Sequence, residues 1–194
     1  MIILMGLAGS GKSTQGNILA DERGAVWLSA GQVLRDTPNE EVHELQRRGE
    51  LVPDTITIPL MAEAMARVLA EEKDIVLDGY PRTVEQAEWV AENAAERILI
   101  VIRIEVPKDE LIRRMELRGR ADDTSREAIE ERFRIVEQNI YTVCEILEAK
   151  DVKIVRIDGT GTPEEVTERI RMAVQTAEEL REIAAENELE AESE

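Results

Sequence analysis

The stretch Gly6–Thr14 constrains this chain more than any other, because its residues fill the pattern G-x-x-x-x-G-K-[ST]. It follows the apolar run Ile2–Met5, which indicates a buried strand, and the apolar spacing at Ile18–Leu19 indicates a helix behind it. Glycines between a strand and a helix let a loop turn its backbone N–H groups inward toward phosphate. Lys12 is then expected to reach the β- and γ-phosphates of a nucleotide, and the Ser13 hydroxyl to ligate Mg²⁺. The residues expected to hold the phosphates are Gly9, Ser10, Gly11, Lys12, Ser13 and Thr14.

Composition excludes several classes of protein. Aromatic residues make up only 3% of the chain and its formal net charge is −18, so a nucleic-acid surface or an anionic-membrane surface is not expected. The single cysteine, Cys144, excludes an internal disulfide and a multi-cysteine zinc site, and it is expected in the core on a helical face. The N-terminal apolar run lacks the basic flank of a signal peptide, so we expect a cytoplasmic protein.

Apolar runs that alternate with helical patterns predict an α/β fold, a five-stranded parallel sheet with helices on both faces. Asp78 ends one of the short buried runs, where a carboxylate could meet the Mg²⁺ held by the glycine-rich loop; a plain turn residue is the alternative. A serine cap is expected at Ser29. The strands are expected at 2–5, 25–28, 75–77, 98–104 and 152–157, and helices at 29–36, 39–49 and 54–72.

Further stretches, in the same order along the chain, resemble the adenylate kinase family of nucleoside monophosphate kinases. The resemblance runs from residue 1 to about residue 175. Besides the glycine-rich loop, it is carried by Ser29–Arg35, Gly49–Asp54, Asp78–Ala87, Arg114, Arg118, Arg120–Asp123, Arg132 and Asp158–Thr160.

This resemblance implies reversible transfer of a phosphoryl group from Mg·ATP to a nucleoside monophosphate. It implies one P-loop kinase domain over 1–185, with a mobile monophosphate-binding segment at about 30–60, a short lid at about 118–125 and an acidic tail at 186–194. The acceptor would be held by Ala30, Gly31, Arg35, Val52, Gly79, Arg82 and Gln86, with the two arginines on its α-phosphate and the glutamine on its base. Arg114 would bind phosphate, Arg118 would lie beside the donor, and Arg120 and Arg132 would converge on the transferred group.

Phosphoryl transfer needs alignment and charge neutralisation more than a nucleophilic side chain, so a lysine, several arginines and Mg²⁺ suit it. Arg114 and Arg118 share one helical face while Arg113 points elsewhere, although arginines among glutamates also form solvated surfaces. Gln86 has an alternative role, because Thr83–Gln86 fits a capping box. His43, the only histidine, is expected to face solvent.

Two features bear on which acceptor is used. Ala30 stands where adenylate kinases typically carry threonine and resembles the UMP/CMP kinase branch, whereas Gln86–Ala87 is the adenylate type. Hydrogen bonding to a base edge discriminates more strongly than one lost hydroxyl contact, so AMP is the expected acceptor and a UMP/CMP kinase is the alternative. A P-loop switch that binds nucleotide without turnover would need neither Arg35 nor Arg82.

The lid and the C-terminus complete the expectations. Arg118–Asp123 leaves no room for an inserted lid domain, which excludes a zinc-stapled lid; Asp122 and Asp123 either orient the lid arginines or favour the next helix. Capping boxes are expected at Thr124–Glu127 and Thr162–Glu165. The helix after Thr162 is longer than the sheet needs, and the residues beyond 185 should be a frayed, solvated tail. A monomer is expected, and an oligomer would form through this C-terminal helix.

Overall fold

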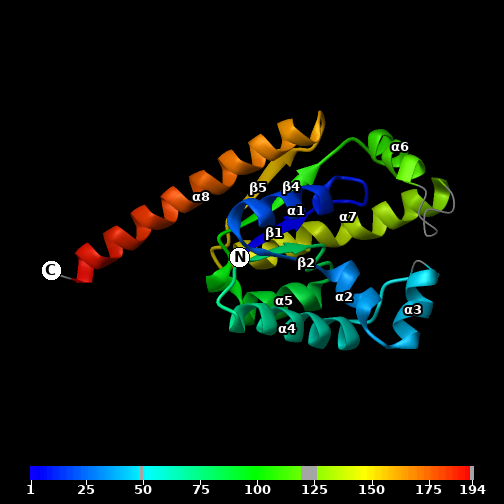
Figure 1. Ribbon diagram of the computed structural model, residues 1–194, viewed down its shortest axis with the longest axis horizontal. Helices are drawn as coiled ribbons and strands as arrows, with labels where there is room; N and C mark the ends of the chain where they lie inside the picture. The colour runs from blue at the N-terminus through cyan, green and yellow to red at the C-terminus, as the bar shows by residue number, and fades with distance from the viewer. Residues whose placement is uncertain (49, 119–125, 193–194) are drawn as a thin grey trace.

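A computed structural model of the chain describes residues 1–48, 50–118 and 126–192. Its centre is a parallel sheet with strand order β2-β3-β1-β4-β5 (Figure 1). The five expected strands are all present to within two residues of their expected bounds, which confirms the predicted fold class. The strands are β1 (Ile2–Met5), β2 (Val26–Ser29), β3 (Ile75–Asp78), β4 (Ile100–Glu105) and β5 (Ile154–Asp158).

Side chains that alternate along the central strands divide the core into two layers. Ile3 and Val101 face a cluster built with α4 (Asp54–Ala70), α5 (Val84–Asn93) and α7 (Arg126–Glu148). Ile2, Leu4 and Ile102 face the other cluster, built with α1 (Lys12–Arg23) and α8 (Pro163–Glu192). Every residue of β1 and β3 is buried, as expected for strands covered on both faces. Cys144 is buried in the first cluster, as predicted.

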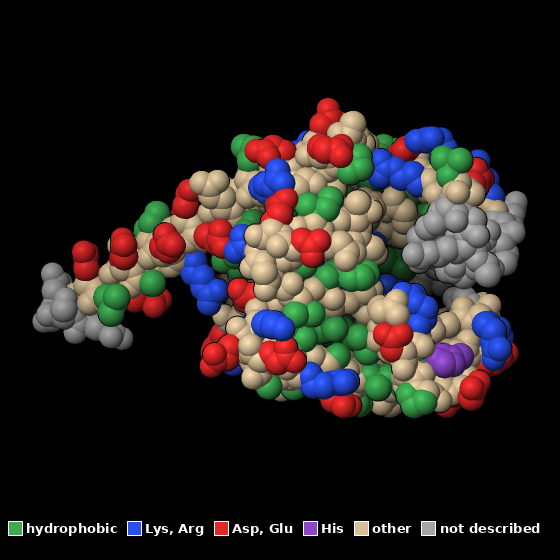
Figure 2. Space-filling view, viewed as in Figure 1, with side chains coloured by type: hydrophobic (Ala, Val, Ile, Leu, Met, Phe, Trp, Pro, Cys, Tyr) green, Lys and Arg blue, Asp and Glu red, His purple; other side chains and the backbone are tan. Residues whose placement is uncertain are grey.

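Short helices project on two sides beyond the end of the sheet where the strands finish. On one side lie α2 (Ala30–Asp36) and α3 (Glu40–Arg47), and on the other lies α6 (Lys108–Arg118) (Figure 1). A short 3₁₀ turn, η1 (Ala95–Arg97), precedes β4. Figure 2 shows the surface hollowed between these projections. Ligands of α/β proteins bind at the carboxyl ends of the parallel strands, so we expect the functional site at this end of the sheet.

Helix starts follow the expected signals in part. The expected capping box at Thr162 is confirmed, because Glu165 Oε2 accepts from Thr162 N at 2.8 Å and Thr162 Oγ1 accepts from Glu165 N at 3.3 Å. The serine cap expected at Ser29 is wrong: the residue precedes α2, but its hydroxyl accepts no bond from the helix. Ser29 instead ends β2, with its backbone paired beside Asp78. The capping box expected at Thr124–Glu127 begins outside the described residues.

The C-terminal residues, where the sequence predicts a solvated, frayed tail, form the last turns of α8. The helix runs to Glu192, so residues 186–192 are helical, although residues 181–191 are exposed to solvent as expected. Glutamate, alanine and leucine dominate this stretch, and it contains neither glycine nor proline, so most of its residues favour a helix. Figure 1 shows α8 leaving the body of the protein. Within the described ranges, no helix is both long and apolar enough to cross a membrane.

Candidate active site

The glycine-rich loop closes on its own lysine. Lys12 Nζ donates to the carbonyl oxygens of Gly6 and Leu7, both at 2.8 Å. Gly6 has φ +145°, and a Cβ atom placed there would lie 2.6 Å from the Ile104 carbonyl oxygen of β4, so only glycine fits against that strand. Gly11 precedes α1 in a left-handed conformation and offers no side-chain cap. The start of α1 is therefore not covered by a side chain of its cap residue, and a helix start of this kind suits an anion such as phosphate.

Ser13 and Asp78 meet at the centre of the sheet's carboxyl end. Ser13 Oγ donates to Asp78 Oδ2 at 2.8 Å, and Asp78 is only 3% exposed. The two strands that lead to them, β1 and β3, are neighbours, with Leu4 paired to Asp78. A hydroxyl and a carboxylate are hard oxygen ligands of the kind Mg²⁺ takes, directly or through water. These residues therefore fit the predicted magnesium site, and the metal-binding role of Asp78 stays a prediction.

Protein side chains alone do not complete such a site. Among the residues that the structure describes, no group of three or more His, Cys, Asp or Glu side chains is placed to hold a metal ion. Mg²⁺ commonly binds through one or two protein oxygens, with substrate phosphates and water as its other ligands. The Ser13–Asp78 pair is consistent with that mode, in which the nucleotide brings the metal.

Replacing Asp78 by asparagine should raise the Mg²⁺ concentration needed for half-maximal phosphoryl transfer and lower kcat/KM about tenfold. Asparagine keeps an oxygen for the Ser13 hydroxyl but loses the charge that attracts the cation. Asp74→Asn is the matched control, because Asp74 precedes the same strand and its side chain is 77% exposed. Mg²⁺ titrations of steady-state rates would measure both variants. An unchanged Mg²⁺ dependence in Asp78→Asn would remove this residue from the metal site.

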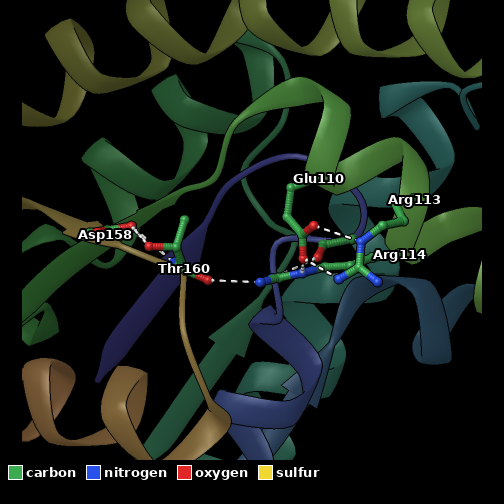
Figure 3. Close-up of polar contacts among 7 residues, drawn as sticks. Glu110, Arg113, Arg114, Asp158 and Thr160 are labelled. Atoms are coloured by element: carbon green, nitrogen blue, oxygen red, sulfur yellow. Dashed lines mark hydrogen bonds and ion pairs between the residues drawn. The ribbon is translucent and has the colours of Figure 1, made fainter.

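Arg114 joins three elements beside the loop. Its Nε donates to Glu110 at 2.8 Å, its Nη2 to the Gly159 carbonyl at 3.2 Å, and its Nη1 to the Gly9 carbonyl at 3.5 Å. Figure 3 shows this guanidinium between α6 and the turn that follows β5. Arg113 also binds Glu110, but its side chain is 63% exposed. The prediction that these two arginines point in different directions is confirmed.

Electrostatics hold the arginine and the neighbouring turn in place. Hydrogen bonds from Arg113 and then from Arg114 lower the pKa of the Glu110 carboxyl from 4.5 to about 2, so it is ionised near neutral pH. In the turn, Asp158 Oδ1 accepts from the N–H of Thr160 at 2.9 Å and from its hydroxyl at 2.7 Å, and these bonds lower the pKa of Asp158 (Figure 3). The Gly159 carbonyl is thereby fixed where Arg114 can bind it.

The packing of α6 decides which of its residues face the loop. Leu111, Ile112 and Met115 are buried against Phe133 of α7, with Leu7 of the glycine-rich loop at the edge of the cluster. With this side of the helix in the core, the residue at position 114 is turned to the loop.

The loop after β3 carries the expected acceptor residues. Arg82 Nε donates to the Gly79 carbonyl at 2.6 Å. Gly79 has φ +74°, and a Cβ atom there would lie 2.5 Å from Arg82 Nη2, so the guanidinium takes up the space that only glycine leaves. Gln86 is 4% exposed and donates through Nε2 to Asp54 at 2.6 Å. Its Oε1 accepts from Arg82 N at 2.8 Å.

The capping box expected at Thr83 is only half formed. Thr83 Oγ1 accepts from Gln86 N at 3.2 Å, as predicted. Gln86 does not return the bond to the cap residue, because its oxygen binds the N–H of Arg82, one residue earlier. The reason is tertiary: Asp54 of α4 draws the nitrogen of the Gln86 amide to itself.

The remaining expected acceptor residues lie on α2 and before α4. Arg35 Nη2 donates to Gln32 at 2.8 Å, and a Cβ atom on Gly31 would lie 3.3 Å from Arg35 Nη1. Ala30 and Val52 are buried. His43 lies at the surface, as expected (Figure 2), and its Nε2 is 3.1 Å from the Arg35 carbonyl oxygen, which connects α3 to α2.

A family model described as adenylate kinase matches residues 4–152. The chain belongs to the adenylate kinase family. A protein named adenylate kinase from Thermus thermophilus is 39% identical over 186 residues, which cover 89% of this chain and 96% of the relative. One from Micrococcus luteus is 37% identical over 186 residues, 89% of each chain. One from Natronomonas pharaonis is 30% identical over 207 residues, 91% of this chain and 97% of the relative.

For this adenylate kinase family member, several expected residues fall outside what the structure describes. Arg120, Asp122 and Asp123 are in the stretch 119–125, and for Arg118 and Arg132 only the helical backbone is described. Their expected roles at the donor and the transferred group therefore stay predictions.

Sequence reasoning missed two carboxylates that hold the site arginines and the glutamine of this adenylate kinase family member. Glu110 lies four residues before Arg114, and that helical spacing was a usable signal. Asp54 carried no comparable signal, because its partners Thr83 and Gln86 are far along the chain and meet it only in the folded protein.

Proposed function

We propose that this adenylate kinase family member transfers the γ-phosphoryl group of Mg·ATP to AMP and yields two molecules of ADP. The observation that supports the proposal is the position of two groups of candidate residues at one end of the sheet. A polyphosphate loop with its Ser13–Asp78 pair follows β1 and β3, and the acceptor-type residues Arg82 and Gln86 follow directly in the loop after β3. A nucleotide-binding switch without turnover would have no use for the second set.

The donor side would work through charge and alignment. Lys12 and the first N–H groups of α1 would hold the β- and γ-phosphates, and the Lys12 ammonium would exchange the carbonyls of Gly6 and Leu7 for phosphate oxygens. Mg²⁺, when bound through Ser13 and Asp78, supplies charge neutralisation. Arg114 would place a further positive charge beside the loop at Gly9. With the nucleotide bound, these groups would be oriented toward its phosphates, and oriented charges of this kind lower the barrier to phosphoryl transfer.

The acceptor side would align the attacking phosphate. Arg82, held at Gly79, and Arg35 of α2 would bind the α-phosphate of AMP, while Gln86 would read the base. The segment 30–60 would close over the acceptor and exclude water, with Arg118 and Arg120 adding charge from a short lid. Positioning two anionic substrates in line accounts for a large part of catalysis in reactions of this type.

One observation favours a second acceptor class. Ala30 is buried at 4% exposure and has no hydroxyl to offer a ligand, which is the feature it shares with UMP/CMP kinases. Gln86 outweighs it in our proposal, because a side chain that hydrogen-bonds a base edge rejects the wrong base more strongly than a lost hydroxyl contact does.

The acceptor preference can be measured directly. With Mg·ATP and AMP, UMP, CMP or GMP in turn, kcat/KM for AMP should exceed the values for UMP and CMP at least about tenfold. Formation of each nucleoside diphosphate is the readout, and a reaction without acceptor is the control for ATP hydrolysis. Turnover of UMP equal to or faster than that of AMP would replace our proposal with the pyrimidine alternative. Nucleotide binding without any diphosphate product would favour a non-catalytic switch.

A further inference from the structure

The amide of Gln86 is held from both sides by groups that can bind it in only one orientation. On one side, Asp54 Oδ1 accepts from Gln86 Nε2 at 2.6 Å; an ionised carboxylate is only an acceptor. On the other side, Arg82 N donates to Gln86 Oε1 at 2.8 Å, and a backbone N–H is only a donor. A flipped amide would point its oxygen at the carboxylate and its N–H at another N–H. Both contacts would be repulsive at a side chain that is 4% exposed.

Asp54 is itself anchored, and not by its own helix. Its other oxygen, Oδ2, accepts from Thr83 Oγ1 at 2.8 Å, so both carboxylate oxygens bind residues at the start of α5. Asp54 lies in the first turn of α4, where an acidic side chain favours the helix N-terminus. Its carboxylate oxygens nevertheless bind Thr83 and Gln86 at the start of α5, so its side chain also connects the two helices.

A fixed amide still has bonding capacity left for a ligand. The NH₂ group has two hydrogens and the oxygen two lone pairs, and one of each is used inside the protein. One donor and one acceptor remain, in an order that the amide cannot reverse. A 6-aminopurine presents a donor at N6 beside an acceptor at N1, whereas a 6-oxopurine of the same shape presents an acceptor beside a donor. One order of amide groups can satisfy only one of these two edges.

We propose that Asp54 is a specificity-determining positioning residue, which sets the Gln86 amide so that the acceptor site takes 6-aminopurine monophosphates and rejects 6-oxopurine monophosphates. This inference rests on the proposed function, because it assumes that Gln86 reads the acceptor base. It adds a residue that does not touch the substrate and acts through the glutamine. The location of Asp54 at the end of the segment 30–60 also connects that segment to base recognition.

AMP and IMP are the matched probes, because they differ only in the donor and acceptor order of the base edge. The ratio of kcat/KM for AMP to that for IMP should fall at least about fivefold in Asp54→Ala, while KM for ATP stays within about twofold of the wild-type value. The ratio does not depend on the fraction of protein that is folded. Glu63→Ala is the control, because Glu63 is an exposed carboxylate on the same helix, and its ratio should stay within about twofold.

A double-mutant cycle tests whether Asp54 acts through the glutamine. In a Gln86→Ala background, Asp54→Ala should change the AMP to IMP ratio by less than about twofold. If Asp54→Ala has no measurable activity, Asp54→Asn decides, because it keeps the shape and one of the two accepting oxygens. Its ratio should fall at least about twofold, since a neutral amide can offer either atom to Gln86.

The inference is overturned by any of three results. The first is a wild-type protein that uses IMP as well as AMP. The second is an AMP to IMP ratio of kcat/KM that falls less than about fivefold in Asp54→Ala or, if that variant is inactive, less than about twofold in Asp54→Asn. The third is a fall in the Gln86→Ala background as large as in the wild-type background, which would mean a purely structural role. The proposed function fails separately, by the comparison of AMP with UMP in the unaltered protein. A protein that prefers AMP over UMP but keeps its AMP to IMP ratio without Asp54 would leave the proposed function intact.

Discussion

Replacing Arg114 by alanine should lower kcat/KM for phosphoryl transfer by about 10² or more, while Arg113→Ala stays within about threefold of the wild-type value. The two arginines are adjacent, lie on the same helix and bind the same carboxylate, Glu110. Only Arg114 extends to Gly9 in the phosphate loop and Gly159 after β5. A positive charge beside the loop would stabilise the negative charge of the reacting phosphates. The loss of kcat/KM should therefore be much larger for Arg114→Ala than for Arg113→Ala.

Comparing Arg114→Ala with Arg113→Ala separates the loss of a charge near the reacting phosphates from a general disturbance of α6. Steady-state rates with ATP and AMP, with a melting curve for each variant, would measure it. Removal of Arg114 also leaves the Glu110 carboxylate without one of its two partners near the loop, so Glu110→Gln combined with Arg114→Ala shows how much of the loss comes from that exposed negative charge. Equal losses in the two single variants would contradict the assignment of Arg114.

A second large loss is expected at the loop lysine. Lys12→Ala should lower kcat/KM by about 10² or more, because the ammonium is expected to leave the carbonyls of Gly6 and Leu7 and follow the phosphates into the transition state. The same bonds close the loop in the protein without nucleotide, so a modest loss of stability should accompany the kinetic effect. Lys73→Ala, at an exposed lysine paired with Glu71, is the control and should leave kcat/KM unchanged within about twofold.

Binding measurements refine the interpretation of that result. If the lysine acts mainly in the transition state, affinity for ATP should fall far less than kcat does. A variant with a wild-type kcat and only a raised KM would show that Lys12 holds substrate and transition state equally, against the role given to it here.

The parts of the fold that depend on local pattern were predictable from the sequence. Strands β1 and β3 are short and wholly apolar up to Asp78 because helices cover both faces, and such runs have few other interpretations. The glycine-rich loop was predictable for a related reason, since its glycines, lysine and hydroxyls are contiguous. The capping box at Thr162 needs only residues three apart, and it forms as expected.

What failed depends on partners that are distant in sequence. Ser29 has the right residue type for a cap, yet the strand pairing of its backbone decides its place. The capping box at Gln86 forms only in part, and the Asp54 carboxylate that binds the Gln86 amide could not be foreseen from the local pattern. In each case a tertiary contact overrides a local preference.

The long α8 helix has two parts that differ in their stability against unfolding. Up to Ala177 one face of the helix is buried in the core, so we expect the hydrogen bonds of this part to open together with the whole fold. From residue 181 to residue 191 every position is exposed, and a free helix of that length is marginal in water. The last turns should therefore melt gradually, as an isolated peptide does, and contribute helical signal that is lost well before the cooperative transition. Circular dichroism of the whole chain would then report two events, and only the sharper one describes the enzyme.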